Sequence, residues 1–196
     1  MNKRSHGFTL PELIVVLAIA AAILAIGAPS FRDFQRNNRL TVAANDVLSA
    51  LITSRAEALR RSNNVSMCTS ANPSATDATC GAGSGWLVFQ DDNGDCARQS
   101  GEEKILGQTV DSDVNAVTNV DCMSFGSNGY KRVIGTTPTT VHMLYCDDRK
   151  NTPRNGSGTE SAARGVEVMP TGRATVVKLM KEIDGWSAGD DGVECP

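Results

Sequence analysis

An uninterrupted apolar run near the N-terminus is the strongest feature of the sequence pattern. Residues 13 to 31 contain no Asp, Glu, Lys, Arg or His. At about 1.5 Å per residue, a helix over this run is long enough to cross a hydrocarbon core of about 30 Å. The run therefore predicts a helix that can span a bilayer.

An amphipathic helical pattern follows the run and ends near Asn63 and Asn64. Pro29 lies just before this pattern and is expected to kink the helix, because proline removes one backbone hydrogen bond and its ring crowds the preceding turn. Beyond Pro29, apolar residues recur at steps of three and four, as on one buried helix face. These residues are Leu40, Ala44, Val47, Leu48, Leu51, Ile52 and Leu59.

The composition changes from residue 63 onward, where Gly, Ser, Thr, Asn and Asp separate short apolar or alternating runs. This spacing predicts an antiparallel β-rich head with the amphipathic helix packed over one face of its sheet, an α+β fold. Surface loops are expected at 72–85 and 147–163. Strands are expected at 65–68, 86–90, 104–110, 122–125, 140–146, 165–169 and 174–179.

The overall composition fits one modest domain with an appended segment, since the 196 residues are 40% hydrophobic and 21% charged. The 22 acidic residues outnumber the 19 Lys and Arg, for a net charge of −3 at pH 7. Loss of an N-terminal leader with Lys3 and Arg4 would make the balance more acidic. A mildly acidic protein is not an obvious binder of polyanions.

Six cysteines lie beyond the apolar run, where an exported head meets an oxidising compartment. They are Cys68, Cys80, Cys96, Cys122, Cys146 and Cys195. The absence of a Cys-x-x-Cys pair, with His142 as the only histidine after the run, disfavours zinc. We therefore expect three disulfides. Many pairings remain open, and we favour Cys68 with Cys80 and Cys146 with Cys195, because each ties a long loop or a tail to a strand.

Glu12 stands alone at the start of the apolar run. A carboxylate carried deep into lipid without a partner costs about 2.5 to 3.5 kcal/mol. Pairing with a cation recovers part of this cost, so a partner cation is expected. Pro11 fits the first turn of the same helix, where its missing N–H has no acceptor to lose.

The stretch from Gly7 to Leu13, after a short basic leader, resembles the prepilin signal of the type IV pilin and type II secretion pseudopilin family. The resemblance implies cleavage between Gly7 and Phe8 by a prepilin peptidase, N-methylation of the Phe8 amine, and pairing of Glu12 with the amine of a neighbouring subunit. It divides the chain into a cleaved leader (1–7), a helix (8–62) and a head (63–196). Within the helix, 8–31 is the transmembrane and filament-core half and 32–62 the amphipathic half.

Motifs in the head resemble the GspH/FimT group, and most of all its FimU and FimT minor pilins. They lie at 85–95, 101–106, 125–129, 164–168 and 171–173. The resemblance implies a non-enzymatic minor pilin that sits at or near the tip of a pilus and helps to initiate assembly by binding other minor pilins and the major pilin. Such a subunit first spans the inner membrane with its head in the periplasm. No cofactor is expected.

Two alternatives within the group stay open, a GspH-like pseudopilin of a type II secretion system and a FimT-like minor pilin for DNA uptake. The second requires a basic Gly-Arg-x-Arg turn, but Gly172-Arg173-Ala174-Thr175 lacks the second arginine. One arginine supplies little affinity for phosphates, and the residues after the turn are mostly acidic, so DNA binding is disfavoured. It would require other cations to gather beside Arg173, namely Arg149, Lys150, Arg154 and Arg164.

Other chemical signals in the head are weaker. Asp91, Asn93, Asp95 and Glu102 imitate a calcium loop, but Cys96 stands where the sharp turn requires Gly, and we expect no metal. His142 lies in an alternating run without a nucleophile pattern, so an enzyme is the outside hypothesis. Trp86 and Phe89 are expected in the core, and Trp186 is expected at the surface, where it could contact a partner.

The N-terminus of the mature protein tests the prepilin interpretation. We expect N-terminal sequencing and mass spectrometry to give a chain that starts at methylated Phe8. An ordinary secretory signal would instead be cut at an Ala-x-Ala-like site near Ile26-Gly27-Ala28 and would give a start near Pro29. Either that start or an intact leader would contradict the prediction.

Overall fold

The structure is a computed structural model that describes residues 9–135, 138–154, 158–188 and 192–196. It contains two compact units, Met1–Asn38 and Arg39–Pro196. The boundary between them falls inside a helix, so the amphipathic half of that helix belongs to the unit of the head. Gly7 and Phe8 lie outside the described residues.

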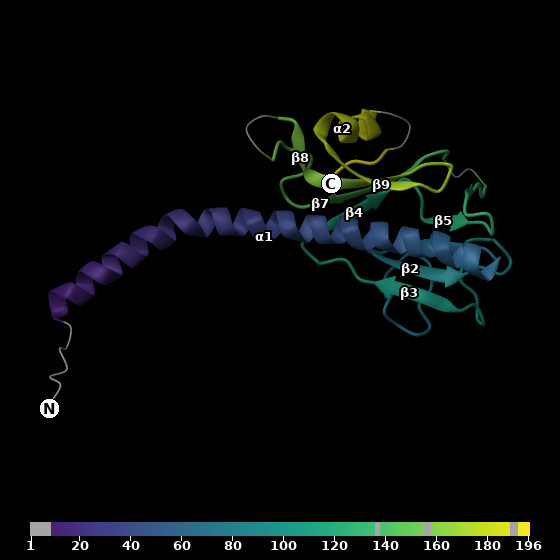
Figure 1. The fold of residues 1–196 in the computed structure, drawn as a ribbon, viewed down its shortest axis with the longest axis horizontal. Helices are drawn as coiled ribbons and strands as arrows, with labels where there is room; N and C mark the ends of the chain where they lie inside the picture. Colours follow the sequence, from purple (N-terminus) through teal and green to yellow (C-terminus); the bar gives the residue numbers. More distant parts are fainter. Residues whose placement is uncertain (1–8, 136–137, 155–157, 189–191) are drawn as a thin grey trace, which may run out of the picture. The chain divides into compact units, whose positions relative to one another are not determined.

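The helix α1 spans Leu10–Arg61 and continues through position 29 (Figure 1). The kink at Pro29 stays a prediction. By length and composition, α1 is able to cross a membrane. In the first unit, large apolar side chains on every side of the helix are more than half exposed. They include Leu10, Leu13, Ile14, Val15, Val16, Leu17, Ile19, Ile23 and Leu24.

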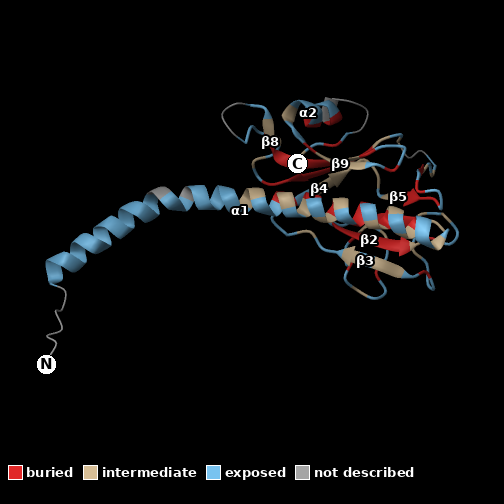
Figure 2. Ribbon diagram, viewed as in Figure 1, coloured by how far each residue is buried: buried red, intermediate tan, exposed pale blue. Residues whose placement is uncertain are grey.

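One narrow face of α1 is buried in the second unit, visible as the red stripe in Figure 2. This face carries Leu40, Ala44, Val47, Ala50, Leu51, Ser54 and Ala58. The expectation that Ile52 and Leu59 belong to it is wrong, since they are 59% and 49% exposed. Each follows a buried residue by one position, a rotation of about 100° around the helix, so the small Ala58 faces the sheets in place of Leu59.

The head contains two antiparallel sheets and a short helix, which confirms the expected fold class. In the first sheet the strand order is β3 (Lys104–Gln108), β2 (Gly85–Gln90), β1 (Val65–Ser70), β5 (Cys122–Phe125) and β6 (Lys131–Arg132). In the second it is β4 (Asn115–Thr118), β7 (Val141–Cys146), β8 (Glu160–Val168) and β9 (Ala174–Leu179), followed by α2 (Met180–Ala188).

Four elements differ from the strands expected from the pattern. The short strands β4 and β6 and the helix α2 were not expected, and β8 begins at Glu160, inside the expected loop 147–163. β4 and β6 have only four and two residues, too few for an alternating pattern to stand out. The first half of β8 is rich in Ser and Ala, which carry little strand preference of their own.

Both sheets pack against the buried face of α1 and form one core. The pleat explains which residues take part: Met67 of β1 and Met143 of β7 face the helix, whereas the next residues, Cys68 and Leu144, face away. On the far side of the second sheet, Leu144 packs with residues of α2. The helix therefore holds two sheets together through side chains that alternate along each strand.

Hydrogen bonds and ion pairs connect the C-terminal end of α1 to the first sheet. The Arg61 guanidinium donates hydrogen bonds to Glu57 (2.7 Å), to the Gln90 side chain at the end of β2 (2.7 Å) and to Glu103 just before β3 (2.6 Å). Hydrogen bonds from Arg60 and Arg61 lower the pKa of Glu57 from 4.5 to about 2. The cluster therefore stays ionised at neutral pH.

Three disulfides join Cys68 with Cys80, Cys96 with Cys122, and Cys146 with Cys195. The first and third are the pairs that the sequence analysis favoured. The first ties a loop to β1, the second ties another loop to β5, and the third ties the C-terminal tail to β7. Each cross-link restricts the conformational freedom of the segment that it joins to a strand.

The turn between β8 and β9 lies against the turn that follows β5. Gly172 has a φ of +77°, and a Cβ atom there would lie 2.5 Å from the Gly129 carbonyl oxygen and 3.2 Å from the Phe125 ring. The Pro170 carbonyl accepts a hydrogen bond from the Lys131 N–H (3.2 Å), which joins the two sheets at this point. Only glycine combines this backbone angle with such a close approach.

We expect Gly172→Ala to lower the free energy of unfolding of the head by about 3 kcal/mol, because it adds a backbone clash to the cost of the left-handed angle. Gly135→Ala is the matched control: Gly135 has a φ of +57°, and nothing lies within 4 Å of its Cβ position. This control is expected to cost about 1 kcal/mol. Urea denaturation measures both, and equal losses would contradict the close approach.

Candidate functional site

The stem of the protein, residues 10–38 of α1, carries the clearest candidate for a functional group. Glu12 lies in the first turn and is the only charged residue between Thr9 and Phe31. Its carboxylate accepts a long hydrogen bond from the Thr9 N–H, at 3.5 Å. A negative charge at a helix N-terminus is favoured by the helix dipole, but the apolar residues after it supply no cation.

Small residues are frequent along the stem and would let a second helix approach closely. They are Ala18, Ala20, Ala21, Ala22, Ala25 and Gly27, all of them exposed. The geometry of the stem thus combines a large uncovered apolar surface with one acid at its start. Where the Phe8 amine lies relative to Glu12 stays a prediction, because Phe8 is outside the described residues.

The acidic loop after β2 uses its carboxylates as acceptors for its own backbone. Buried Asp91 accepts hydrogen bonds from the N–H groups of Gly94 (2.7 Å) and Cys96 (3.0 Å), and from the Ser66 hydroxyl. Glu102 accepts them from the N–H groups of Asp92 (3.0 Å) and Gln99 (2.8 Å). These donors take the carboxylate lone pairs that a calcium ion would use. In the described ranges, no three His, Cys, Asp or Glu residues form a metal-binding group.

Arg173 is exposed in the turn between β8 and β9, where its carbonyl accepts a hydrogen bond from the Met169 N–H. The other cations that DNA binding would require do not gather beside it. The Arg154 N–H pairs with the Glu160 carbonyl at the opposite end of β8, and Lys150 lies in the turn that leads toward that end. The strand therefore separates these cations from Arg173.

The two remaining arginines are committed to other contacts. Arg149 donates hydrogen bonds from Nε to both carboxylate oxygens of Asp147, at 3.1 and 3.0 Å. Arg164 is buried within β8 and donates to the carbonyls of Ser161 and Ala163, both at 2.7 Å. Burial lowers the pKa of Arg164. Neither guanidinium belongs to a basic surface around Arg173.

Trp186 is buried and is 6% exposed, so the expectation of an exposed partner contact is wrong. Its ring stacks on His142 of β7 with centroids 4.4 Å apart. His142 Nε2 lies 3.3 Å from a carboxylate oxygen of Glu167 on the neighbouring strand β8. The stack fastens α2 to the second sheet, which is a structural role for both residues.

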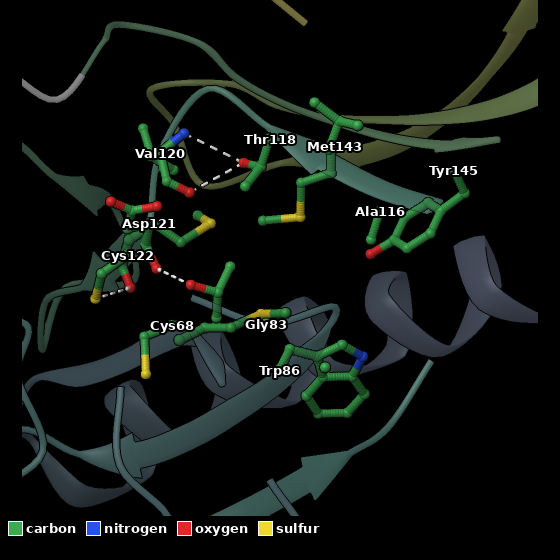
Figure 3. A pocket seen from close by; sticks show the side chains of 15 residues that line it. Cys68, Gly83, Trp86, Ala116, Thr118, Val120, Asp121, Cys122, Met143 and Tyr145 are labelled. Atoms are coloured by element: carbon green, nitrogen blue, oxygen red, sulfur yellow. Dashed lines mark hydrogen bonds between the residues drawn. The ribbon is translucent and has the colours of Figure 1, made fainter. Parts of the chain in front are cut away.

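A cavity between the two sheets was not foreseen from the sequence. It is lined by residues of β1, β2 and β5 from the first sheet and of β4 and β7 from the second (Figure 3). Among them are Met67, Trp86, Met123, Met143 and Tyr145. Burial, with a smaller effect of Asp46, raises the pKa of Tyr145. The lining residues come from five strands that are far apart in the sequence, so no local sequence motif predicts the cavity.

Two family models match the chain. The model described as type II transport protein GspH matches residues 43–172, more than half of the chain, and the model of the prokaryotic N-terminal methylation motif matches residues 2–28. Two curated relatives, both named fimbrial protein and both from Pseudomonas aeruginosa, are 34% identical over 79 residues. This stretch is 40% of the chain, and the chain spans about half (49%) of the length of these relatives.

Solved structures of similar proteins include the type IV minor pilin FimU of Pseudomonas aeruginosa, at 19% identity and a TM-score of 0.47, covering 74% of this chain and 92% of that one. Another is the minor pseudopilin EpsH from the type 2 secretion system of Vibrio cholerae, at 8% identity and a TM-score of 0.47, covering 71% and 97%. The family assignment depends on the two family models, which together match residues 2–28 and 43–172, most of the stem and most of the head. The chain belongs to the GspH family of type IV minor pilins and type II secretion pseudopilins.

Proposed function

We propose that this protein is a minor pilin of a type IV pilus that enters the filament at or near its tip and helps to initiate assembly by binding other minor pilins. The observation that carries the proposal is the stem, whose exposed apolar side chains surround a helix with one acid at its start. Such a surface requires lipid or other stems to cover it. A pilin stem leaves the lipid bilayer and packs against other stems when the filament assembles.

The steps of this exchange follow from the chemistry of the stem. The protein resides first in the inner membrane, with its head in the periplasm, and a prepilin peptidase cuts between Gly7 and Phe8. The methylated Phe8 amine of a neighbouring subunit, a major or a minor pilin, then pairs with Glu12 as the stems bundle through their small residues. One repeated head-to-tail contact of this kind generates a helical filament.

A pseudopilin of a type II secretion system is the second candidate. The matching family model carries the description type II transport protein, which favours it, whereas the curated relatives named fimbrial protein favour a pilus. Both machines use the same stem. Crosslinking through the head in assembled filaments, followed by identification of the crosslinked subunit, distinguishes them.

The surface chemistry does not favour DNA uptake as the function. Arg173 is the one arginine at its turn, while Arg164 is buried in β8. Arg149 is paired with Asp147, and Arg154 lies at the far end of β8. Nonspecific affinity for DNA grows with the number of phosphates contacted, so a single arginine contributes little. A structural role without catalysis agrees with the family.

Replacement of Glu12 tests the proposed assembly step. We expect Glu12→Ala to insert into the inner membrane as well as the wild type, because loss of the charge makes transfer into lipid easier. Its incorporation into filaments should fall about tenfold or more, because the neighbour's amine is left buried without a partner. Immunoblots of sheared filaments and of membranes measure the two pools.

Asp33→Asn serves as the matched control, since Asp33 is an exposed acid on the same helix but lies beyond the apolar run. This variant should enter filaments normally, and Glu12→Asp should retain part of the activity. Unchanged incorporation of Glu12→Ala, or an equal loss with Asp33→Asn, would refute the pairing.

A further inference from the structure

Three large apolar side chains are exposed at one end of the head. Leu59 near the end of α1, Tyr130 in the turn after β5 and Met169 in the turn after β8 are 49%, 55% and 38% exposed. The end of α1, β5 and the turn between β8 and β9 lie at the same end of the head (Figure 1). Apolar side chains that gather on a surface mark an interaction site, whereas single ones are common.

Close contacts show that these side chains belong to one surface. A Cβ atom at Gly129, next to Tyr130, would lie 3.2 Å from both methyl carbons of Leu59. A Cβ atom at Gly172, in the turn that begins at Met169, would lie 2.5 Å from the Gly129 carbonyl oxygen. Gly129 therefore lies between the three, and we call Leu59, Tyr130 and Met169 the Leu59 patch.

Hydrogen bonds within the two turns hold the patch in a fixed conformation. The Tyr130 carbonyl accepts a hydrogen bond from the Gly126 N–H (3.0 Å), and the Met169 carbonyl accepts one from the Gly172 N–H (2.9 Å). A surface that is ordered before binding loses less conformational entropy when a partner docks. The patch is thus suited to binding without rearrangement.

Two cations border the patch. The Arg55 Nε lies 3.3 Å from the position of a Cβ atom at Gly129, and Arg173 is exposed in the turn between β8 and β9. Among the residues that the structure describes, neither guanidinium has an ion-pair partner, whereas Arg60 on the same helix pairs with Glu57 at 2.6 Å. A protein of net charge −3 therefore keeps two uncompensated cations beside exposed apolar side chains.

The composition of this surface favours a protein partner. Tyr, Met and Arg are enriched at protein interfaces, and Tyr and Arg contribute much of the binding energy there. Binding to a phosphate chain or to an anionic membrane grows with the number of cations, and two supply little. Charge complementarity then requires a partner surface with apolar side chains and carboxylates at its edge.

We propose that the Leu59 patch binds the head of a different pilin subunit in the same filament, with carboxylates of that head paired to Arg55 and Arg173. The inference rests on the proposed function, since it names the surface by which this minor pilin binds a neighbour. Leu59 lies about 30 Å along α1 from Arg39, where the head unit begins. Substitutions in the patch therefore leave the stem sequence intact.

Photocrosslinking from Tyr130 tests the contact in assembled filaments of the full chain. The photoreactive residue p-benzoylphenylalanine replaces Tyr130, and mass spectrometry identifies the crosslinked peptide. We expect a peptide from the head of another pilin, with Asp or Glu close to the crosslinked residue. The matched control places the same probe at Leu179, which is 48% exposed and ends β9 away from the turn, and it should not give this product.

Charge reversal tests the ion pairs. The double variant Arg55→Glu with Arg173→Glu should lower incorporation into filaments about tenfold, because carboxylates then face carboxylates. Lys178→Glu with Lys181→Glu makes the same change of charge at exposed positions outside the patch and should be incorporated normally. Replacing the crosslinked partner's carboxylates by Lys should restore the first variant. Immunoblots of membranes check that all variants accumulate equally.

Several outcomes would overturn the proposal: no crosslink from Tyr130, a crosslink to lipid or to a second copy of this chain, equal losses in the two double variants, or no restoration by the partner's lysines. The stem is judged separately by Glu12→Ala. Normal incorporation of Glu12→Ala together with the Tyr130 crosslink would refute the stem pairing alone. Loss with Glu12→Ala but not with the Arg55 and Arg173 variant would refute the patch alone.

Discussion

The burial of one narrow face of α1 against two separate sheets is the interaction on which the head depends. Neither sheet covers the other's apolar face completely, and the helix contributes to a core that contains residues of both. Leu40 and Leu51 are almost fully buried in this core, with small alanines between and after them. The small residues matter because they let the strands approach the helix closely, so that one helix serves two sheets.

Disulfides add covalent links to segments that lie outside the two sheets. The long loops after β1 and β2 and the C-terminal tail are each joined by a disulfide to a strand, in addition to apolar contacts such as those of Ala78 and Val193, which are fully buried. The acidic loop is held in addition by Asp91 and Glu102, which accept hydrogen bonds from backbone N–H groups. Carboxylates that look like cation ligands in the sequence therefore serve as local structural acceptors.

The stem differs from the head in that its apolar side chains are exposed on every side of the helix. Among the described residues of the first unit, no side chain buries this surface, so the free energy of the stem depends on the molecules that surround it. Lipid and a bundle of other apolar stems cover it about equally well, since both are apolar. In the assembly step that we propose, Glu12 breaks this balance, because its carboxylate is costly in lipid and is attracted to the amine of a neighbouring subunit. This proposed pairing would give direction to a step that the hydrophobic effect alone leaves nearly neutral.

Features that depend on neighbouring residues in the chain were readable from the amino-acid order. The apolar run, the lone Glu12 and the alternation along Val141–Cys146 are local patterns, and they predicted the stem, the motif and an antiparallel head. Features that depend on tertiary packing could not be predicted from the sequence. The packing of the helix against the sheets decides which side of α1 is buried near Leu59. It also decides where Trp186 lies and how far Arg154 is from Arg173. The cavity around Tyr145 is the extreme case, because its walls come from five strands, and no local pattern specifies a space between them.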